Sequence, residues 1–345
     1  IDLLMQTGSV EEAENAAVEL TRKAADYLPA YRALVRSALV QKKYDEAESR
    51  IQEIFKRHQS DYETRLLQAR LWLSQGKTKQ VIGDLEKFGR DFPGLGLEKQ
   101  LLAIAYDQAK ERDKAVVALQ EAVMRNPDNI DAQLHLARLL VQGGDPQPAA
   151  ASMAQLINNR PSLMPAYSVL IEATRAMDKL DQAAAVIASS IKKLPNNPQL
   201  HYMLGVLAVQ LQKPAEARLI FERALALKGD YLAISAELVA LDLNEGKTDS
   251  ARGRAKEMIA KTPDSAVPWF LMARTQGATQ NWDEAEASIL NGLELDSKQA
   301  AFYRLLSDSF LGRKDDPNIV AKVDAILAKR PADELAHLAA TRFYN

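Results

Sequence analysis

Cysteine is absent from the 345 residues of this chain, which excludes disulfide bonds and thiolate metal sites. Aromatic residues are scarce, at 6% of the sequence. The formal net charge is only −2 at pH 7, so bulk charge favours neither nucleic acid nor an anionic membrane as a partner. Charged residues also interrupt every apolar run well before the roughly 20 residues that a membrane span requires. We therefore expect a folded protein with no transmembrane segment and no nucleic-acid partner.

Proline, in contrast, recurs at a fixed interval. Six of the 14 prolines are separated by 34 residues or a multiple of 34, and the two empty slots hold Gly229 and Ser297. The prolines of this series are Pro93, Pro127, Pro161, Pro195, Pro263 and Pro331. A regular period of this length is the signature of a repeat protein, in which each unit packs on its neighbours.

Small residues follow the same period at two further positions. Seven alanines lie twelve residues before the proline slot: Ala47, Ala115, Ala149, Ala183, Ala217, Ala251 and Ala285. A second series lies twelve residues earlier still: Ala69, Ala103, Ala137, Gly205 and Ala273. Two helices approach closely only where neither carries a bulky side chain at the crossing. These series therefore predict closely packed helix pairs.

Each 34-residue unit contains two apolar-periodic segments of about twelve residues, the length of an ordinary helix. Gly76, Gly144 and Gly246 lie in the turn between them, as expected for a left-handed helix C-terminus. We predict one array with a partial repeat at 1–27 and a truncated first helix at 334–345. The nine full repeats between them are 28–61, 62–95, 96–129, 130–163, 164–197, 198–231, 232–265, 266–299 and 300–333.

The period, the small-residue positions and the phrase Tyr44-Asp45-Glu46-Ala47 resemble the tetratricopeptide repeat family. The resemblance implies an all-α fold, a right-handed superhelical solenoid of helical hairpins, and a role as an interaction scaffold. In this family the first helix of each repeat lines a concave surface. Both ends are expected to be truncations within a longer protein, which would leave Phe343 and Tyr344 with nothing to pack against.

No arrangement of residues indicates catalysis, a metal or a cofactor. The four histidines fall in four different repeats, without the i, i+4 spacing of a helical metal site. Gly76-Lys77-Thr78 resembles the end of a phosphate-binding loop, but the glycine required five residues earlier is replaced by Leu71. We therefore predict a non-enzyme without metal or cofactor.

Arginine recurs on the first helices. It occupies the ninth position of a repeat at Arg36, Arg70, Arg138, Arg274 and Arg342. Arg32, Arg175 and Arg304 are expected on nearly the same face, with Tyr202 and Phe270 as the main aromatic residues there. This arginine stripe could bind carboxylate or phosphate groups through bidentate hydrogen bonds. Alternatively, the arginines could form salt bridges with acids of adjacent repeats, such as Glu63, Asp107, Asp131, Glu172 and Asp308.

The main functional prediction is a protein-interaction scaffold that holds an extended, acidic partner segment in its concave groove. One alternative is direct binding of an acidic polysaccharide by the arginine stripe; another is a regulatory extension of an enzyme. The Ala-, Gln- and Lys-rich composition also resembles long multi-repeat proteins of Gram-negative envelopes that serve exopolysaccharide assembly or export. That resemblance implies a bacterial periplasmic or envelope location. Oligomeric state is not predicted.

Overall fold

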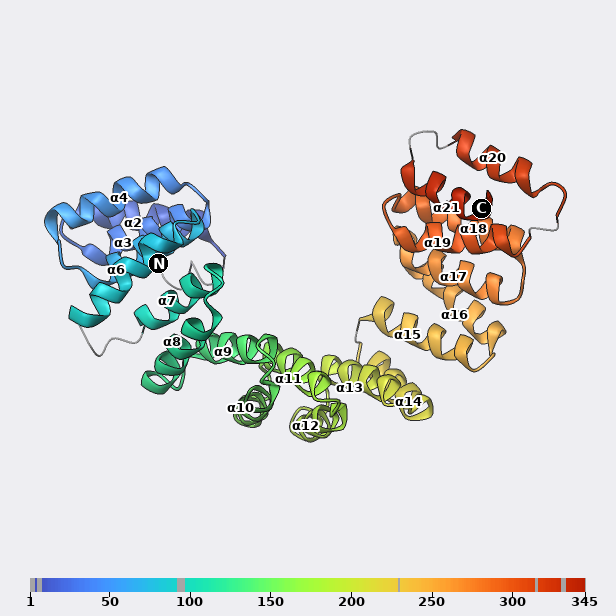
Figure 1. The fold of residues 1–345 in the computed structure, drawn as a ribbon, viewed down its shortest axis with the longest axis horizontal. Helices are drawn as coiled ribbons and strands as arrows, with labels where there is room; N and C mark the ends of the chain where they lie inside the picture. Colours follow the sequence, from blue (N-terminus) through green and yellow to red (C-terminus); the bar gives the residue numbers. More distant parts are fainter. Residues whose placement is uncertain are drawn as a thin grey trace. The chain divides into compact units, whose positions relative to one another are not determined.

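The computed structural model describes residues 4, 8–91, 97–228, 230–313, 316–329 and 333–344. Within those residues the regular structure is entirely α-helical, with helices α2–α21 (Figure 1). The predicted all-α class is confirmed, and the fold is an α–α superhelix of helical hairpins. The chain divides into two compact units, Ile1–Lys179 and Leu180–Asn345. Each is described by itself below.

The described residues of the first unit form ten helices of 12–14 residues. They are α2 (Val10–Lys23), α3 (Leu28–Val40), α4 (Tyr44–Arg57), α5 (Tyr62–Ser74), α6 (Thr78–Asp91), α7 (Leu97–Gln108), α8 (Arg112–Arg125), α9 (Ile130–Gln142), α10 (Pro146–Asn159) and α11 (Met164–Ala176). Helix α3 begins where the first predicted full repeat begins, and α5, α9 and α11 start the repeats at 62, 130 and 164 in the same way. Odd-numbered helices from α3 onward are thus the first helices of the predicted repeats.

The second unit contains helices α12–α21. They are α12 (Leu180–Lys193), α13 (Pro198–Gln210), α14 (Pro214–Ala226), α15 (Tyr231–Asn244), α16 (Thr248–Lys261), α17 (Ala266–Ala278), α18 (Trp282–Leu295), α19 (Ala300–Leu311), α20 (Ile319–Lys329) and α21 (Glu334–Tyr344). The division between the units falls inside the predicted repeat 164–197. The grouping of all repeats into one array stays a prediction.

The described turns inside the hairpins share the same left-handed backbone. Residues at this position have φ between 57° and 85° and recur every 34 residues. Four are glycines, which adopt this conformation without strain: Gly8, Gly76, Gly144 and Gly246. The others are Lys42, Lys110, Asp178, Gln212 and Gln280. The period found in the sequence is therefore also a period of backbone conformation.

The predicted small-residue positions lie in the cores of the units. All seven alanines of the first series are at most 2% exposed. At the Gly205 position, a Cβ atom would lie 2.5 Å from the ring of Phe221, so the neighbouring helix occupies the space that a side chain would need. Val81 and Ile319, the larger residues in two equivalent slots, are also buried. Small size at these positions is thus usual but not obligatory.

Prolines begin helices rather than interrupt them. Pro29, Pro146, Pro165, Pro198 and Pro214 lie in the first turn of their helices, where the missing N–H would have no partner inside the helix. Among the described residues, no proline lies beyond the first turn of a helix. Pro93, Gly229 and Pro331 of the period-defining series lie outside them.

The expectation that the aromatic residues of the last helix lack packing partners is wrong. Phe343 packs edge-on against Phe310 at a centroid distance of 6.1 Å, and the Tyr344 hydroxyl donates a hydrogen bond to Asp324 at 2.7 Å. The aromatic end of helix α21 thus packs against α19 and α20.

None of the described helices combines the length and the apolar character of a membrane span.

Candidate functional site

Three consecutive first helices of the first unit, α3, α5 and α7, line a groove of about 480 Å³, within the range of about 300–1,000 Å³ typical of ligand sites. We call it the α3/α5/α7 groove. Its lining residues are Arg36, Leu39, Val40, Leu67, Arg70, Leu73, Ser74, Gln100, Leu101 and Ile104. On each helix these residues are spaced by one, three or four positions, so they share one face.

The helix starts that orient this face are set locally. Asp61 caps α5 by accepting a hydrogen bond from the backbone N–H of Thr64 at 2.8 Å, and Pro29 occupies the first turn of α3. Because consecutive repeats present equivalent positions side by side, Arg36, Arg70 and Ile104 occupy the same slot on the three helices. The groove therefore brings together two of the predicted arginines.

The groove is apolar with a positive charge. Among the described residues, Arg36 and Arg70 are the only charged ones that line it, and the other side chains are six aliphatic residues, a serine and a glutamine. Arg70 is exposed and has no side-chain hydrogen bond or ion pair within the described part of the chain. Val40 is 60% exposed at the edge, so its apolar side chain is accessible to a partner. The groove thus offers both an apolar surface and a cationic donor.

Arg32, also predicted for this surface, forms ion pairs with Asp61 of its own predicted repeat and with Glu63 of the next. Its Nε donates to Asp61 Oδ2 at 3.0 Å, a second guanidinium nitrogen bonds the other Asp61 oxygen, and Nη1 lies 2.7 Å from Glu63. The Arg32 side chain is only 14% exposed. For Arg32, the structure therefore matches the salt-bridge alternative, including its predicted partner Glu63.

The ion pair makes Asp61 a stronger acid. Burial alone would raise the pKa of Asp61, but hydrogen bonds from Arg32 and Thr64 outweigh it and hold the pKa below the ordinary 3.8. Ionised Asp61 therefore contributes stability that is present above pH about 4 and is lost as the pH falls through the lowered folded pKa.

Replacing Arg32 by alanine is expected to raise the pKa of Asp61 toward its ordinary value, because the largest favourable interaction of the carboxylate is lost. The acid-dependent part of the stability should shrink accordingly. Carboxyl carbon shifts in an NMR titration measure this pKa, and Arg70→Ala serves as the control that should leave it unchanged. An unaltered Asp61 pKa in Arg32→Ala would contradict this account.

The remaining predicted arginines lie on other first helices. Arg138 on α9 and Arg175 on α11 are exposed in the first unit, whereas Arg274 on α17 is half-buried and Arg304 on α19 exposed in the second. None of them lines the α3/α5/α7 groove. The nine predicted site residues therefore fall into two units and do not form one described site.

Arg138 lies close to His135 and influences its charge. Burial is the main cause that lowers the pKa of His135, and the positive charge of Arg138 adds to it. Asp107 on α7, 3.7 Å from His135 Nε2, acts in the opposite direction without overcoming the burial. This pairing uses one of the acids, Asp107, that the sequence suggested as an arginine partner.

The two predicted aromatic residues pack against the core. Phe270 meets Phe302 edge-on at 5.5 Å between ring centroids, and Tyr202 contacts Phe221 at 6.1 Å. Both are half-buried. Their rings are thus partly committed to packing rather than fully available to a ligand.

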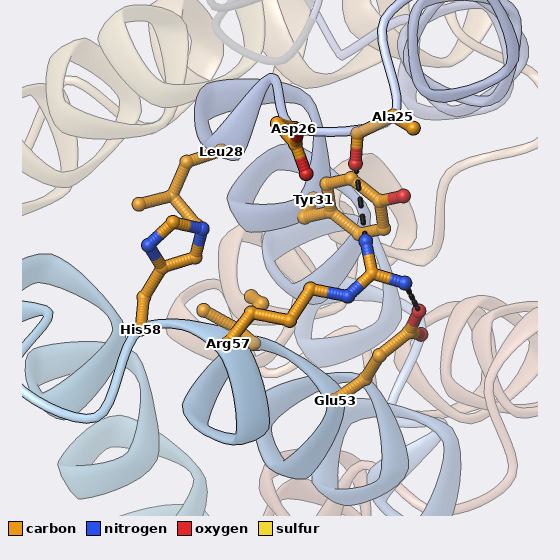
Figure 2. A pocket seen from close by; sticks show the side chains of 8 residues that line it. Ala25, Asp26, Leu28, Tyr31, Glu53, Arg57 and His58 are labelled. Atoms are coloured by element: carbon orange, nitrogen blue, oxygen red, sulfur yellow. Dashed lines mark hydrogen bonds and ion pairs between the residues drawn. The ribbon is translucent and has the colours of Figure 1, made fainter.

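A second, much smaller pocket lies where the α2–α3 turn meets the end of α4 (Figure 2). Its volume of about 10 Å³ is that of a single water molecule at most. Arg57 reaches across it, donating to the Ala25 carbonyl at 3.1 Å and lying 3.5 Å from Glu53, with its guanidinium 5.8 Å from the Tyr31 ring centre (Figure 2). The protein's own side chains fill this pocket, which makes it structural.

The arginine series of the sequence does not indicate the aliphatic residues between its members. Leu39, Val40, Leu73 and Ile104 form much of the groove surface. The signal in the sequence is their spacing from the arginines, since Leu39 and Leu73 lie one turn after Arg36 and Arg70. A large aliphatic residue on an exposed helix position is otherwise too common to indicate a site.

Models of the tetratricopeptide repeat match much of the sequence. One matches residues 101–171, and another matches 32–80 and 170–231. Together the matched segments cover slightly more than half of the chain. No curated protein sequence matches significantly.

Several solved structures are similar in fold. A tetratricopeptide repeat protein of Parabacteroides merdae is 12% identical, and the alignment covers 86% of this chain and 99% of that one with a TM-score of 0.43. The Thermus thermophilus protein TTC0263 is 24% identical over 54% of this chain and 99% of its own, with a TM-score of 0.36. YrrB, described as having an unusual peptide-binding site, is 19% identical over 54% of this chain and 96% of its own, at a TM-score of 0.38.

Proposed function

The chain belongs to the tetratricopeptide repeat family, and from that premise we propose that it is a non-enzymatic scaffold that binds an extended partner segment in the α3/α5/α7 groove. Tetratricopeptide repeats serve generally as protein–protein interaction surfaces, so a protein partner is the expectation for the chain as a whole. The observation that carries the proposal for this groove is its lining: two arginines, no acid and six aliphatic side chains.

This lining specifies the chemistry of the partner segment. Aliphatic side chains of the partner would cover Leu39, Val40 and Leu73, gaining about 25 cal/mol for each Å² of apolar surface buried. A carboxylate beside them would meet Arg70, whose planar guanidinium can donate two parallel hydrogen bonds. A segment that alternates acidic and aliphatic residues fits both requirements.

A polysaccharide fits the groove less well. Its described lining contains no aromatic ring on which a sugar could stack, and six of the ten lining residues are aliphatic and offer no hydrogen bond to hydroxyl groups. A role in exopolysaccharide or envelope assembly stays a prediction from composition. A regulatory role toward an enzyme also stays a prediction.

A peptide-display selection against the whole chain tests the proposal. We expect selected peptides to be enriched in Asp or Glu next to Leu, Ile or Val. Arg70→Glu should weaken their binding at least about 10-fold, because an attraction becomes a repulsion at a desolvated contact. Val40→Asp should weaken it as well. The matched control is Arg223→Glu, an exposed arginine on α14 outside the groove, which should leave affinity within about twofold.

Two outcomes would overturn the proposal. One outcome is that peptides are selected but bind Arg70→Glu and Val40→Asp as tightly as the wild type. That result would place the binding site elsewhere on the chain. The other outcome is that no peptide is selected, that the chain binds a polyuronate such as alginate, and that Arg70→Glu abolishes this binding. That result would support the polysaccharide alternative. Circular dichroism verifies that each variant keeps its helical content.

A further inference from the structure

A second groove, of about 470 Å³, lies between α6 and α8 with α7 at its base. We call it the α6/α8 groove, and it shares no lining residue with the α3/α5/α7 groove. Its apolar surface consists of Leu85, Gly89, Leu102, Val117 and Ala118. It therefore offers a separate surface to a different partner.

Most charges around the α6/α8 groove are satisfied within the chain. Lys99 pairs with Glu121 at 2.7 Å, Lys114 pairs with Glu111 at 2.6 Å, and the Tyr106 hydroxyl bonds Glu86. Arg90 on α6 and Asp113 on α8 are the exceptions. Both line the groove and are exposed, and neither has an ion pair or side-chain hydrogen bond in the part of the chain that the structure describes. One positive and one negative group thus remain available.

Exposed apolar side chains of α8 form a ridge beside the α6/α8 groove. Val117 is 54% exposed and Met124 is 74% exposed, and their spacing of seven residues places them on one face two turns apart. Across the groove, Gly89 of α6 has no side chain, and a Cβ added there would meet nothing within 4 Å. The surface therefore carries a protruding aliphatic ridge next to an open space.

We propose that the occupant of the α6/α8 groove is the same surface of a second copy of this chain, related by a two-fold axis. A two-fold interface joins a patch to itself, so every feature must have its complement within that patch. Here Val117 of each copy enters the open space at Gly89 of the other. Arg90 of each copy faces Asp113 of the other copy. The interface then contains two Arg90–Asp113 ion pairs, related by the two-fold axis.

The charge balance argues for a copy over a foreign segment. An acidic or a basic partner would satisfy one of the two unpaired groups and oppose the other. A second copy pairs with both Arg90 and Asp113. The net charge of only −2 per chain causes little electrostatic repulsion between two copies. The ridge and the hollow lie side by side in the same patch, as an interface between identical surfaces requires.

Sedimentation velocity over a concentration series to about 500 µM measures the association. We expect the wild type to dimerise and Val117→Glu to raise the dissociation constant at least about 10-fold, because it places an unpaired charge in an apolar contact. Leu219→Glu, on an equally exposed aliphatic residue of α14 (69% exposed), is the matched control and should change it by no more than about twofold.

A charge exchange then tests the orientation of the two copies. Arg90→Glu and Asp113→Arg, each alone, should weaken dimerisation about 3- to 10-fold, whereas the double variant restores it to within about twofold of the wild type. A wild type that stays monomeric throughout the series overturns the proposal. The proposal is also overturned if Val117→Glu leaves the dimer intact. It is overturned equally if the double variant does not recover the affinity that the single charge variants lose.

Discussion

Replacing Asp242 by alanine is expected to destabilise the second unit by about 3 kcal/mol, because removal of one partner from a buried ion pair leaves the other charges uncompensated. Asp242 lies on α15 and is 1% exposed. One carboxylate oxygen lies 2.7 Å from Arg218 Nη1 on α14, and the other accepts from Arg254 Nε on α16 at 3.0 Å. One side chain thus joins three consecutive helices.

The expected cost lies at the low end of the range for buried pairs, since Arg218 and Arg254 are 19% and 32% exposed and recover some hydration. Asp242→Asn keeps the volume and one acceptor, so it should cost less than Asp242→Ala. The matched control, Asp264→Ala, removes an exposed acid from a turn and should cost no more than about 0.5 kcal/mol.

Urea unfolding followed by tryptophan fluorescence measures these differences. Trp269 and Trp282 lie in the second unit and Trp72 in the first, so a Trp72→Phe background makes the signal specific for the second unit. A loss below about 1 kcal/mol for Asp242→Ala would show that the desolvation of the three charges nearly cancels their attraction.

Gly292→Ala is the second substitution with a large expected effect. Gly292 lies in α18, and a Cβ atom there would be 2.1 Å from Cζ and 2.3 Å from Cε1 of Phe302. Phe302 is fully buried and held edge-on by Phe270, so its ring cannot turn away. We expect a net loss of up to about 2 kcal/mol, since overpacking costs up to about 3 kcal/mol and exceeds the gain of about 1 kcal/mol from helix propensity.

Two further variants identify the cause. Gly253→Ala on α16 adds the same methyl group where nothing lies within 4 Å, and it should stabilise the chain by about 0.5–1 kcal/mol. Phe302→Leu should partly rescue Gly292→Ala, so that the double variant loses less than the sum of the two single losses. Additive losses, measured by the same fluorescence assay, would show that the methyl group and the ring do not meet.

The helical hairpins could be predicted from sequence because their determinants are local. A glycine in the turn of a hairpin, such as Gly76 or Gly144, indicates a left-handed turn. A proline in the first turn, such as Pro198, indicates where a helix begins. Ala183 and its equivalents report a close helix crossing. Each signal depends on residues within one repeat, and the 34-residue period multiplies it, so the helix limits follow almost to the residue.

The roles of individual arginines depended on tertiary structure. Arg32 and Arg36 are four residues apart on one helix, yet Arg32 is bound by Asp61 at the end of its own repeat and by Glu63 of the next, while Arg36 lines a groove with Arg70. Helical periodicity places a side chain on a face but does not determine which neighbour its end reaches. That choice is made by the packing angle between repeats, to which both helices contribute.

By itself, the sequence determined the family, the all-α class and the position of each hairpin, because repeated local patterns specify them. Tertiary structure alone decided that the chain forms two compact units, that α3, α5 and α7 enclose an apolar groove around Arg70, and that α6 and α8 leave a second groove at Gly89. Grooves arise from the spacing between helices of different repeats. That spacing is the outcome of many side-chain contacts at once, and no single stretch of sequence records it.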